Sequence, residues 1–238
     1  MQTALGLIYP PQCVMCDAIV DESFQLCGTC WRATPFISGL VCDTCGTPLP
    51  GDDAGHAETC DDCLAIARPW DRGRAALLYR DGAKRLVLSL KHGDRQDLAH
   101  PAAGWMAAAA KPILEPDMLI VPIPLHWLRL LRRRYNQAAL LANRLGKTLL
   151  LQVAPDALIR NKSTQVQDSM SRDDRFRNVS GAFAPHPKRG ALLKGRSVLL
   201  VDDVMTSGAT FAAATETCHA AGASRVSVLS LARVAKDA

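Results

Sequence analysis

The sequence predicts an α/β protein, in which a parallel sheet is flanked by helices and preceded by a small cysteine-rich module. Three observations lead to this prediction. Eight of the nine cysteines form four C-x-x-C pairs between Cys13 and Cys63. After Trp70, short apolar runs alternate with longer runs of helical periodicity. One apolar run ends in two aspartates, and a small hydroxylated loop and an alanine-rich stretch follow it.

Length and composition fit one ordinary domain with a small appendage, because 238 residues that are 48% hydrophobic can bury a packed core. No apolar run is long enough to span a bilayer, and no basic segment followed by a hydrophobic stretch opens the chain. We therefore expect a cytoplasmic protein without membrane insertion. In a reducing compartment, nine cysteines favour metal binding over disulfides.

The net charge of +5 conceals an asymmetry. Residues 1–70 hold 2 Lys/Arg and 9 Asp/Glu, whereas residues 71–238 hold 26 and 14, a net of +12. The basic part is where we expect an anionic partner, either a phosphorylated metabolite or a nucleic acid. Charge alone does not choose between them.

The cysteine pairs predict two structural zinc ions. Two thiolates in C-x-x-C spacing reach one tetrahedral ion, and two such pairs leave no open position for water. CDTCGTPL reads as a zinc-ribbon knuckle, and CGTCWRA and CDDCLAIA read as knuckles that lead into helices. The predicted ligands are Cys13, Cys16, Cys27, Cys30, Cys42, Cys45, Cys60 and Cys63.

Sequential pairing would place the first four cysteines on one ion and the last four on the other. A cross-braced arrangement that exchanges the middle pairs is the alternative. His56 in place of a thiol, and four disulfides in place of zinc, are further alternatives. We place the module at residues 1–69 and the larger domain at residues 70–238.

The larger domain reads as alternating strands and helices, which argues for a parallel sheet with helices on its faces. Predicted strands are AALLY, MLIVPIP, SVLLVDDV and RVSVLSLARV. Predicted helices are AKRLVLSLKH, RQDLAHPAAGWMAAAAK, LHWLRLLRRRYNQAALLANRLGK and ATFAAATETCHAAGA. Ligands in such sheets bind at the carboxyl ends of the strands.

The segment from Ser197 to Ala223 carries the most chemistry. Its strand leads into Asp202 and Asp203, then into a loop of small residues from Thr206 to Thr210, then into a helix. Backbone N–H groups at a helix N-terminus bind phosphate, and hydroxyls add donors. Carboxylates at the strand end accept hydrogen bonds from ribose hydroxyls and help to hold Mg²⁺. The pattern therefore suits a phosphorylated sugar.

Rival explanations of the two aspartates are a P-loop NTPase and simple helix capping. A P-loop requires G-x-x-x-x-G-K-[ST], and the nearest match, at Gly146, has Leu141 where the first glycine should be. We therefore reject the P-loop.

DDVMTSGAT resembles the phosphoribosyl-pyrophosphate (PRPP) signature of type I phosphoribosyltransferases, and nearly the whole chain resembles the ComF family, also called GntX-like or competence-protein-F-like. That family joins a zinc-binding module to a phosphoribosyltransferase domain, and some members act in DNA uptake during natural transformation. The resemblance implies a type I phosphoribosyltransferase-like fold, bound PRPP–Mg²⁺ and a double zinc ribbon. Asp202 and Asp203 would be catalytic, orienting the ribose. The implied PRPP-binding residues are Val204, Met205, Thr206, Ser207, Gly208, Ala209, Thr210, Lys91, Arg132, Arg133 and Arg160.

Three further blocks support the resemblance. YRDGAKRLVLSLKHGDRQDLA is similar to the family's first strand and helix, and includes Lys91, Gly93 and Asp94. VPIPLHWLRLLRRRYNQAALLA resembles the pyrophosphate-loop region, with Arg134 where the family often has glycine, so the local turn is expected to differ. LIRNKSTQVQDSMSRDDRFRNVSGAF matches the next block at Arg160, Thr164, Gln167, Arg175, Asn178, Gly181 and Phe183. Its polar stretch, residues 161–178, predicts a lid or flexible loop, with a disordered linker as the alternative.

A second hypothesis comes from a different class of protein. The basic cleft and the zinc module would bind single-stranded DNA, and phosphoribosyl chemistry would be vestigial or regulatory. An aromatic content of 5% is thin for a stacking platform. A helicase of the competence machinery is a further partner that only the resemblance suggests.

Overall fold

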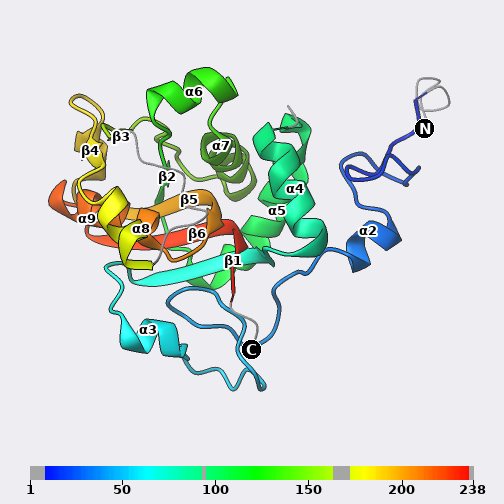
Figure 1. Ribbon diagram of the computed structural model, residues 1–238, viewed down its shortest axis with the longest axis horizontal. Coiled ribbons are helices and arrows are strands. Elements are labelled where there is room, and N and C mark those ends of the chain that lie inside the picture. Colours follow the sequence, from blue (N-terminus) through cyan, green and yellow to red (C-terminus); the bar gives the residue numbers. More distant parts are fainter. Residues whose placement is uncertain (1–8, 93–94, 163–171, 236–238) are drawn as a thin grey trace.

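The computed structural model describes residues 9–92, 95–162 and 172–235. Within this range, the side chains of His92, Arg129, Arg132, Arg133, Arg172 and Asp173 are not described. The described chain forms a sheet covered by helices on both faces, and two cysteine-rich segments extend from it along different sides (Figure 1). The predicted α/β class is confirmed.

The main sheet has four parallel strands in the order β1-β6-β5-β2. Their bounds are β1 Arg72–Leu78, β2 Leu119–Pro122, β5 Ser197–Met205 and β6 Arg225–Arg233. Each of the four overlaps a predicted strand, because buried parallel strands appear in a sequence as continuous apolar runs. The last strand in the chain thus lies inside the sheet, between the first and the fifth.

Helices cover both faces of this sheet. The longer helices are α4 Asp81–His92, α5 Ala99–Ala110, α7 Gln137–Leu149, α8 Arg172–Val179 and α9 Ala209–Ala220. The shorter ones are α2 Gly28–Arg32, α3 Asp61–Ala65, α6 Trp127–Arg133 and the 3₁₀ turns η1 Gln96–Leu98, η2 Lys111–Ile113 and η3 Gly190–Leu193. Helices α5 and α7 pack against each other and on the sheet, while α9 packs with α8 on β5 and β6.

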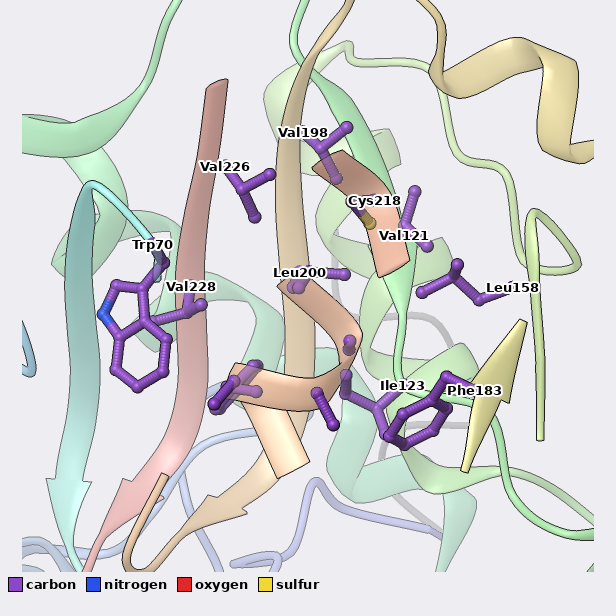
Figure 2. Packing of buried hydrophobic residues seen from close by; sticks show 14 of the residues in the cluster. Trp70, Val121, Ile123, Leu158, Phe183, Val198, Leu200, Cys218, Val226 and Val228 are labelled. Atoms are coloured by element: carbon purple, nitrogen blue, oxygen red, sulfur yellow. The ribbon is translucent and has the colours of Figure 1, made fainter. Parts of the chain in front are cut away.

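Strand β5 divides the core into two clusters. Val198 and Leu200 belong to the cluster on the α9 side, together with Cys218 of α9 (Figure 2). Leu199 and Val201 belong to the other cluster, which contains residues of α4, α5 and α7. Successive strand side chains point to opposite faces, so a continuous apolar run supplies both clusters.

Three parts of the fold differ from the prediction. The single helix predicted over residues 125–147 is two helices, α6 and α7, because Arg134 takes a left-handed conformation that ends the first. A short antiparallel pair, β3 Leu158–Arg160 and β4 Phe183–Pro185, was not predicted. Strands of three residues are too short to produce a periodic signal. Helix α8 occupies the end of the segment predicted as a lid, and residues 163–171 of that segment lie outside the described range.

Across these described residues, we find no helix that combines the length and the apolar character needed to cross a membrane.

Candidate functional site

Two carboxylates lie near the end of β5, inside the sheet. Asp203 is only 7% exposed, and its Oδ1 lies 3.2 Å from the Nζ of Lys91. Lys91 comes from the last turn of α4, so helix and strand meet at the carboxyl edge of the sheet. In open α/β sheets this edge is where ligands bind.

Asp202 lies in a more unusual environment than its neighbour. Its Oδ1 accepts a hydrogen bond of 2.9 Å from the backbone N–H of Asp203. Burial, and then the charge of Asp203, raise the pKa of Asp202 to about 7, although that hydrogen bond and the charges of Lys91 and Arg160 act in the opposite direction. A carboxyl with such a pKa changes its charge near neutral pH, which is typical of functional sites.

Arg160 completes the charged group. It ends β3, and its guanidinium lies 5.3 Å from the centre of the Phe183 ring on β4. The unpredicted β3–β4 pair thus holds this arginine beside the end of β5. Of the site residues predicted from the sequence, Lys91, Arg160, Asp202 and Asp203 are brought together, and their roles toward a ligand remain predictions.

The loop after β5 is shorter than predicted. Strand β5 extends through Val204 to Met205, and α9 begins at Ala209, so only Thr206, Ser207 and Gly208 form the loop. Ala209 and Thr210 lie in the first turn of α9, where N–H groups are available to an anion.

Gly208 is the residue before this helix, and its φ of 82° is left-handed. A Cβ atom at this position would lie 2.9 Å from the Trp70 ring. Conformation and space therefore both require glycine.

Two arginines that the sequence analysis did not identify contact the outer side of this loop. Arg233 Nη1 donates to the carbonyl of Met205 at 3.3 Å, and Arg68 Nη1 donates to the carbonyl of Ser207 at 2.9 Å. One signal was available for Arg233, which is 4% exposed at the end of the apolar run RVSVLSLARV. Burying an arginine is costly unless it is paired.

The pyrophosphate side of the predicted site is only partly described. The backbone of Arg132 and Arg133 lies in α6, and their side chains are outside the described part of the structure. The predicted matches at Gly93, Asp94, Thr164 and Gln167 also lie outside it. These assignments remain predictions.

The residues that follow α6 have structural roles. Arg134 lies at φ 66°, the left-handed conformation that glycine adopts most easily, so arginine here retains a glycine-like turn. The Tyr135 hydroxyl donates to the carbonyl of Leu90 at 2.7 Å. Asn136 caps α7 through the N–H of Ala138 and donates to the carbonyl of Ile123 at 3.0 Å. These bonds anchor the start of α7 beside the turn of α4 that carries Lys91.

The cysteines form two clusters, in each of which the four sulfurs lie within 4.8 Å of one another. The first consists of Cys13, Cys16, Cys27 and Cys30, and the second of Cys42, Cys45, Cys60 and Cys63. This is the sequential pairing, so the cross-braced alternative is wrong. His56 belongs to neither cluster.

The clusters fit zinc in their dimensions. Sulfurs at about 2.3 Å from a tetrahedral ion are about 3.8 Å apart. The Cys16–Cys27 and Cys45–Cys60 sulfur pairs are separated by 3.6 and 3.7 Å. All eight of these cysteines are free in the structure, so the alternative of four disulfides is not observed.

Both clusters are built in the same way. The Cys27 N–H donates to the sulfur of Cys13 at 3.2 Å, and the Cys60 N–H donates to the sulfur of Cys42 at 3.3 Å. Burial raises the pKa of Cys13, but backbone N–H groups outweigh it and bring the value to about 6. Such N–H groups favour the thiolate that zinc requires.

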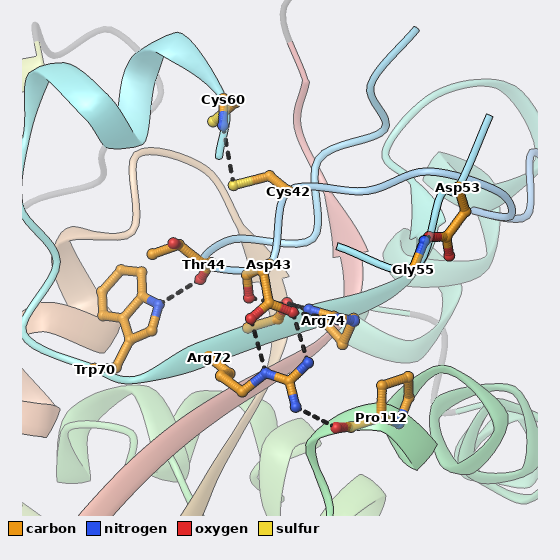
Figure 3. A network of polar contacts seen from close by, with 11 residues as sticks. Cys42, Asp43, Thr44, Asp53, Gly55, Cys60, Trp70, Arg72, Arg74 and Pro112 are labelled. Carbon is orange, nitrogen blue, oxygen red and sulfur yellow. Dashed lines mark hydrogen bonds and ion pairs between the residues drawn. The ribbon is translucent and has the colours of Figure 1, made fainter. Parts of the chain in front are cut away.

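The second ribbon is docked on β1 (Figure 3). Asp43, inside the first knuckle of this ribbon, accepts two hydrogen bonds from Arg72, of 2.8 and 2.7 Å, and one of 2.6 Å from Arg74. The hydrogen bond from Arg72 is the largest cause that lowers the pKa of Asp43 below its usual range, and Arg74 lowers it further, although burial acts in the opposite direction. The Trp70 indole donates to the carbonyl of Thr44 at 2.6 Å.

Comparison with protein-family models gives two matches. Residues 4–64 match the model described as double zinc ribbon domain. Residues 136–238 match the model described as phosphoribosyl transferase domain. The two matched regions contain, respectively, the two cysteine clusters and the strand with the paired aspartates.

Curated relatives are similar over nearly the full length. The DNA utilization protein YhgH of Escherichia coli strain K12 is 30% identical over 235 residues, which is 95% of this chain and 99% of that protein. Competence protein F of Haemophilus influenzae is 28% identical, covering 87% of this chain and 90% of that protein. A hypoxanthine phosphoribosyltransferase from Staphylococcus aureus is similar in structure with a TM-score of 0.38 and 14% identity, covering 58% of this chain and 64% of that one.

Proposed function

Since the chain belongs to the ComF/YhgH family of proteins with a double zinc ribbon and a phosphoribosyltransferase domain, we propose that it binds PRPP together with Mg²⁺ at the carboxyl end of β5. One observation carries the proposal. Two carboxylates and two cations, Asp202, Asp203, Lys91 and Arg160, meet beside a glycine-containing loop at a helix N-terminus. A sugar with hydroxyls and two anionic phosphate groups needs this combination of donors and acceptors.

Each part of the ligand has a matching group. The carboxylates of Asp202 and Asp203 accept hydrogen bonds from the ribose hydroxyls. The N–H groups of the loop and of the first turn of α9 receive the 5′-phosphate, aided by the hydroxyls of Thr206, Ser207 and Thr210. Lys91 and Arg160 face the pyrophosphate, and Arg132 and Arg133 are the further candidates there.

In a chain that retains catalysis, the reaction is displacement at C1 of the ribose. An incoming nucleophile forms a bond to C1 as the bond from C1 to the pyrophosphate oxygen breaks, and pyrophosphate leaves with the electron pair. Lys91 and Arg160 stabilise the charge that develops on the leaving group, and the aspartates stabilise the oxocarbenium-like ribose. Magnesium carried by PRPP would add positive charge beside the pyrophosphate, held by the same carboxylates.

The test is calorimetric titration of PRPP with Mg²⁺ into the zinc-loaded protein and into the Asp203→Asn variant. We expect saturable binding to the wild type and a loss of about tenfold to a hundredfold in the variant, because a charged hydrogen-bond acceptor is removed. The matched control is Asp117→Asn. Asp117 is exposed just before β2, at the opposite edge of the sheet, so this variant should bind as the wild type does.

Two outcomes would contradict the proposal. If the folded, zinc-loaded wild type does not bind PRPP–Mg²⁺, PRPP is not the ligand of this protein. If the Asp203→Asn variant and the wild type bind PRPP–Mg²⁺ equally well, the ligand does not bind at the carboxyl end of β5.

The second candidate function is single-stranded DNA binding without phosphoribosyl chemistry. It is favoured by the net charge of +12 over residues 71–238 and by relatives named for DNA utilization and competence. Affinity for a fluorescent oligonucleotide that falls steeply with salt and does not respond to PRPP supports this candidate. Competition between PRPP and the oligonucleotide would place both ligands in one cleft. A helicase partner remains a prediction of the family resemblance.

A further inference from the structure

The loop of residues 206–208, proposed above to receive the 5′-phosphate, is called the phosphate loop below. Three consecutive carbonyl groups, one at the end of β5 and two in this loop, point toward two arginine side chains. Arg233 Nη1 donates to the carbonyl of Met205 at 3.3 Å and also to that of Thr206. Arg68 Nη1 donates to the next carbonyl, that of Ser207, at 2.9 Å. The backbone of the loop is thus held from one side over three successive peptide units.

This arrangement determines where the loop's N–H groups point. In a planar trans peptide the C=O and the N–H point in opposite directions. Since the carbonyls of residues 205–207 are directed to the arginines, the N–H groups of residues 206–208 are directed to the other side of the loop. Successive N–H groups on one side form an anion-binding concavity, and Gly208 supplies its left-handed member.

Arg233 also reaches the second cysteine cluster. Arg233 Nη2 lies 3.8 Å from the sulfur of Cys45, across 188 residues of sequence. One sulfur of this cluster is therefore in contact with a guanidinium group that also holds the loop after β5.

Trp70 provides a further connection between the second cysteine cluster and the loop. Its indole N–H donates to the carbonyl of Thr44 in the knuckle, and its ring lies against Gly208. The guanidinium of Arg68 lies 5.5 Å from the centre of the same ring. Knuckle, aromatic ring, arginine and loop thus form one packed unit.

We propose that Arg68 and Arg233 are positioning residues that link the second tetracysteine cluster to the phosphate loop, so that zinc in this cluster and a 5′-phosphate in the loop strengthen each other's binding. The inference rests on the proposed function for the identity of the ligand. A cluster of four thiolates around zinc is anionic and attracts Arg233, and its knuckle holds Arg68 through Trp70. Both arginines also donate to the carbonyls that orient the loop. Without the metal the sulfurs separate, and the arginines lose the partners that hold them in place.

The first cluster provides an internal control. Its described contacts run to the other side of the molecule: Arg95 donates to the carbonyl of Val14 at 3.0 Å, and the N–H of Gly82 donates to the carbonyl of Ala33. None of the hydrogen bonds within the described ranges joins Cys13, Cys16, Cys27 or Cys30 to residues 205–210. Zinc in the first cluster should therefore leave phosphate binding unchanged.

The first test compares arginine variants of full-length, zinc-loaded protein. Arg233→Met and Arg68→Met remove the donors and retain much of the side-chain volume. Arg74→Met is the matched control, because Arg74 is buried and bonded to Asp43 in the same knuckle but has no bond to the loop. The probe is ribose 5-phosphate, which carries the 5′-phosphate and lacks the pyrophosphate.

We expect Arg233→Met and Arg68→Met to weaken ribose 5-phosphate binding about tenfold or more, while Arg74→Met lowers thermal stability without changing affinity. Hydrogen exchange of the peptide that contains residues 205–211 should accelerate in the first two variants alone. Equal affinity and equal exchange in all three variants would overturn the proposal.

The second test uses the metal. Release of the two zinc ions to a chromogenic chelator should occur in two phases, and saturating ribose 5-phosphate should slow one phase only. Cys63→Ser should weaken ribose 5-phosphate binding, and Cys16→Ser in the first cluster should not. Ligand that slows neither phase, or slows both equally, contradicts the coupling. If Cys63→Ser does not fold, the arginine variants and the release kinetics decide.

The outcomes of these experiments distinguish the proposed function from the proposed coupling between zinc and the loop. Wild type that binds neither ribose 5-phosphate nor PRPP refutes the proposed function, and hydrogen exchange of the loop in Arg233→Met and Cys63→Ser still decides whether the cluster orders it. Wild type that binds both ligands, with arginine variants that bind them equally well, refutes the coupling alone.

Discussion

At the scale of single residues, Asp202 should make the free energy of unfolding depend on pH. Its pKa of about 7 in the folded protein lies above the ordinary value of 3.8. At a pH between these two pKa values, the Asp202 carboxyl of the folded protein holds a proton that the unfolded chain has released. The free energy of unfolding contributed by this carboxyl therefore falls as the pH rises through that window.

The Asp202→Asn variant tests this assignment. Asparagine does not ionise, so the stability of the variant relative to the wild type should increase from about pH 5 to about pH 8 by a few kcal/mol at most, since one pKa unit is about 1.4 kcal/mol. Urea unfolding at several pH values measures the difference. A difference that stays constant across the range would show that Asp202 ionises normally in the folded protein.

Arg134 supports a second prediction at this scale. Its left-handed conformation is strained for a residue with a Cβ atom, so Arg134→Gly should raise the free energy of unfolding by about 1 kcal/mol. Arg144→Gly, in the exposed interior of α7, is the matched control and should lower it by about the same amount. Destabilisation by both substitutions would mean that Arg134 makes a contact that outweighs the backbone strain.

Single residues also show what the sequence could and could not predict. Asp202, Asp203 and Lys91 lie in recognisable blocks, and the structure brings them together. Arg68 and Arg233 belong to no motif, and their contacts with Ser207 and Cys45 cross 139 and 188 residues. Contacts of that range depend on the tertiary arrangement, which local patterns do not encode.

At the scale of elements, the close approach of the first knuckle of the second ribbon to β1 depends on glycine. A Cβ atom at Gly73 would lie 2.4 Å from the carbonyl oxygen of Thr44 and 2.9 Å from Val228. The nearest of these atoms belongs to the backbone of the knuckle, which cannot move without displacing Cys45 beside it. Strand and ribbon therefore fit together only with glycine at this position.

Gly73→Ala should lower the free energy of unfolding by about 2 kcal/mol or more, because overpacking against the backbone forces strand and knuckle apart. It should also accelerate zinc loss from the second cluster. Gly104→Ala in α5 is the control, since none of the described atoms outside the helix's own backbone lies within 4 Å of the added atom, and it should be neutral or stabilising. Thermal melts and chelator kinetics measure both effects, and an unchanged Gly73→Ala variant would contradict the packing.

The length of an element decided whether it could be predicted from the sequence. Strands β5 and β6 and helix α9 are long enough to be recognised in the sequence, and they were predicted. The β3–β4 pair holds Arg160, yet each strand has three residues and pairs with a segment more than twenty residues away. The position of Arg160 therefore could not be derived from pattern alone, although the family resemblance selected the residue.

At the scale of the whole molecule, the ribbons cover an edge of the sheet. Strand β1 is an outer strand in the order β1-β6-β5-β2, and an uncovered edge strand invites association with other chains. The N–H groups of Gly73 and Leu78 donate to the carbonyls of Asp43 and Pro35, and the Ala76 carbonyl accepts from Ile37. The cysteine-rich segment thus satisfies the free side of β1.

A fragment of residues 70–238, cut at the predicted domain boundary, should consequently be less stable than the full chain and should associate. Light scattering and thermal melts of the fragment beside the full-length protein measure both properties. A monomeric fragment with unchanged stability would show that residues 70–238 fold independently, and would make the ribbon a separable appendage. The position of the boundary itself remains a prediction.

The place of β6 in the sheet has a consequence for synthesis on the ribosome. The strand is the last to be translated, and yet it lies between β1 and β5, so the sheet cannot close until residues 225–233 have left the exit tunnel. Both sets of zinc-binding cysteines are complete once Cys63 has emerged. A nascent chain therefore carries metal-binding ribbons well before it has a sheet for them to cover. We expect a message that ends translation before β6 to yield a product that takes up zinc but leaves the loop of Thr206, Ser207 and Gly208 without support, since Arg233 is missing.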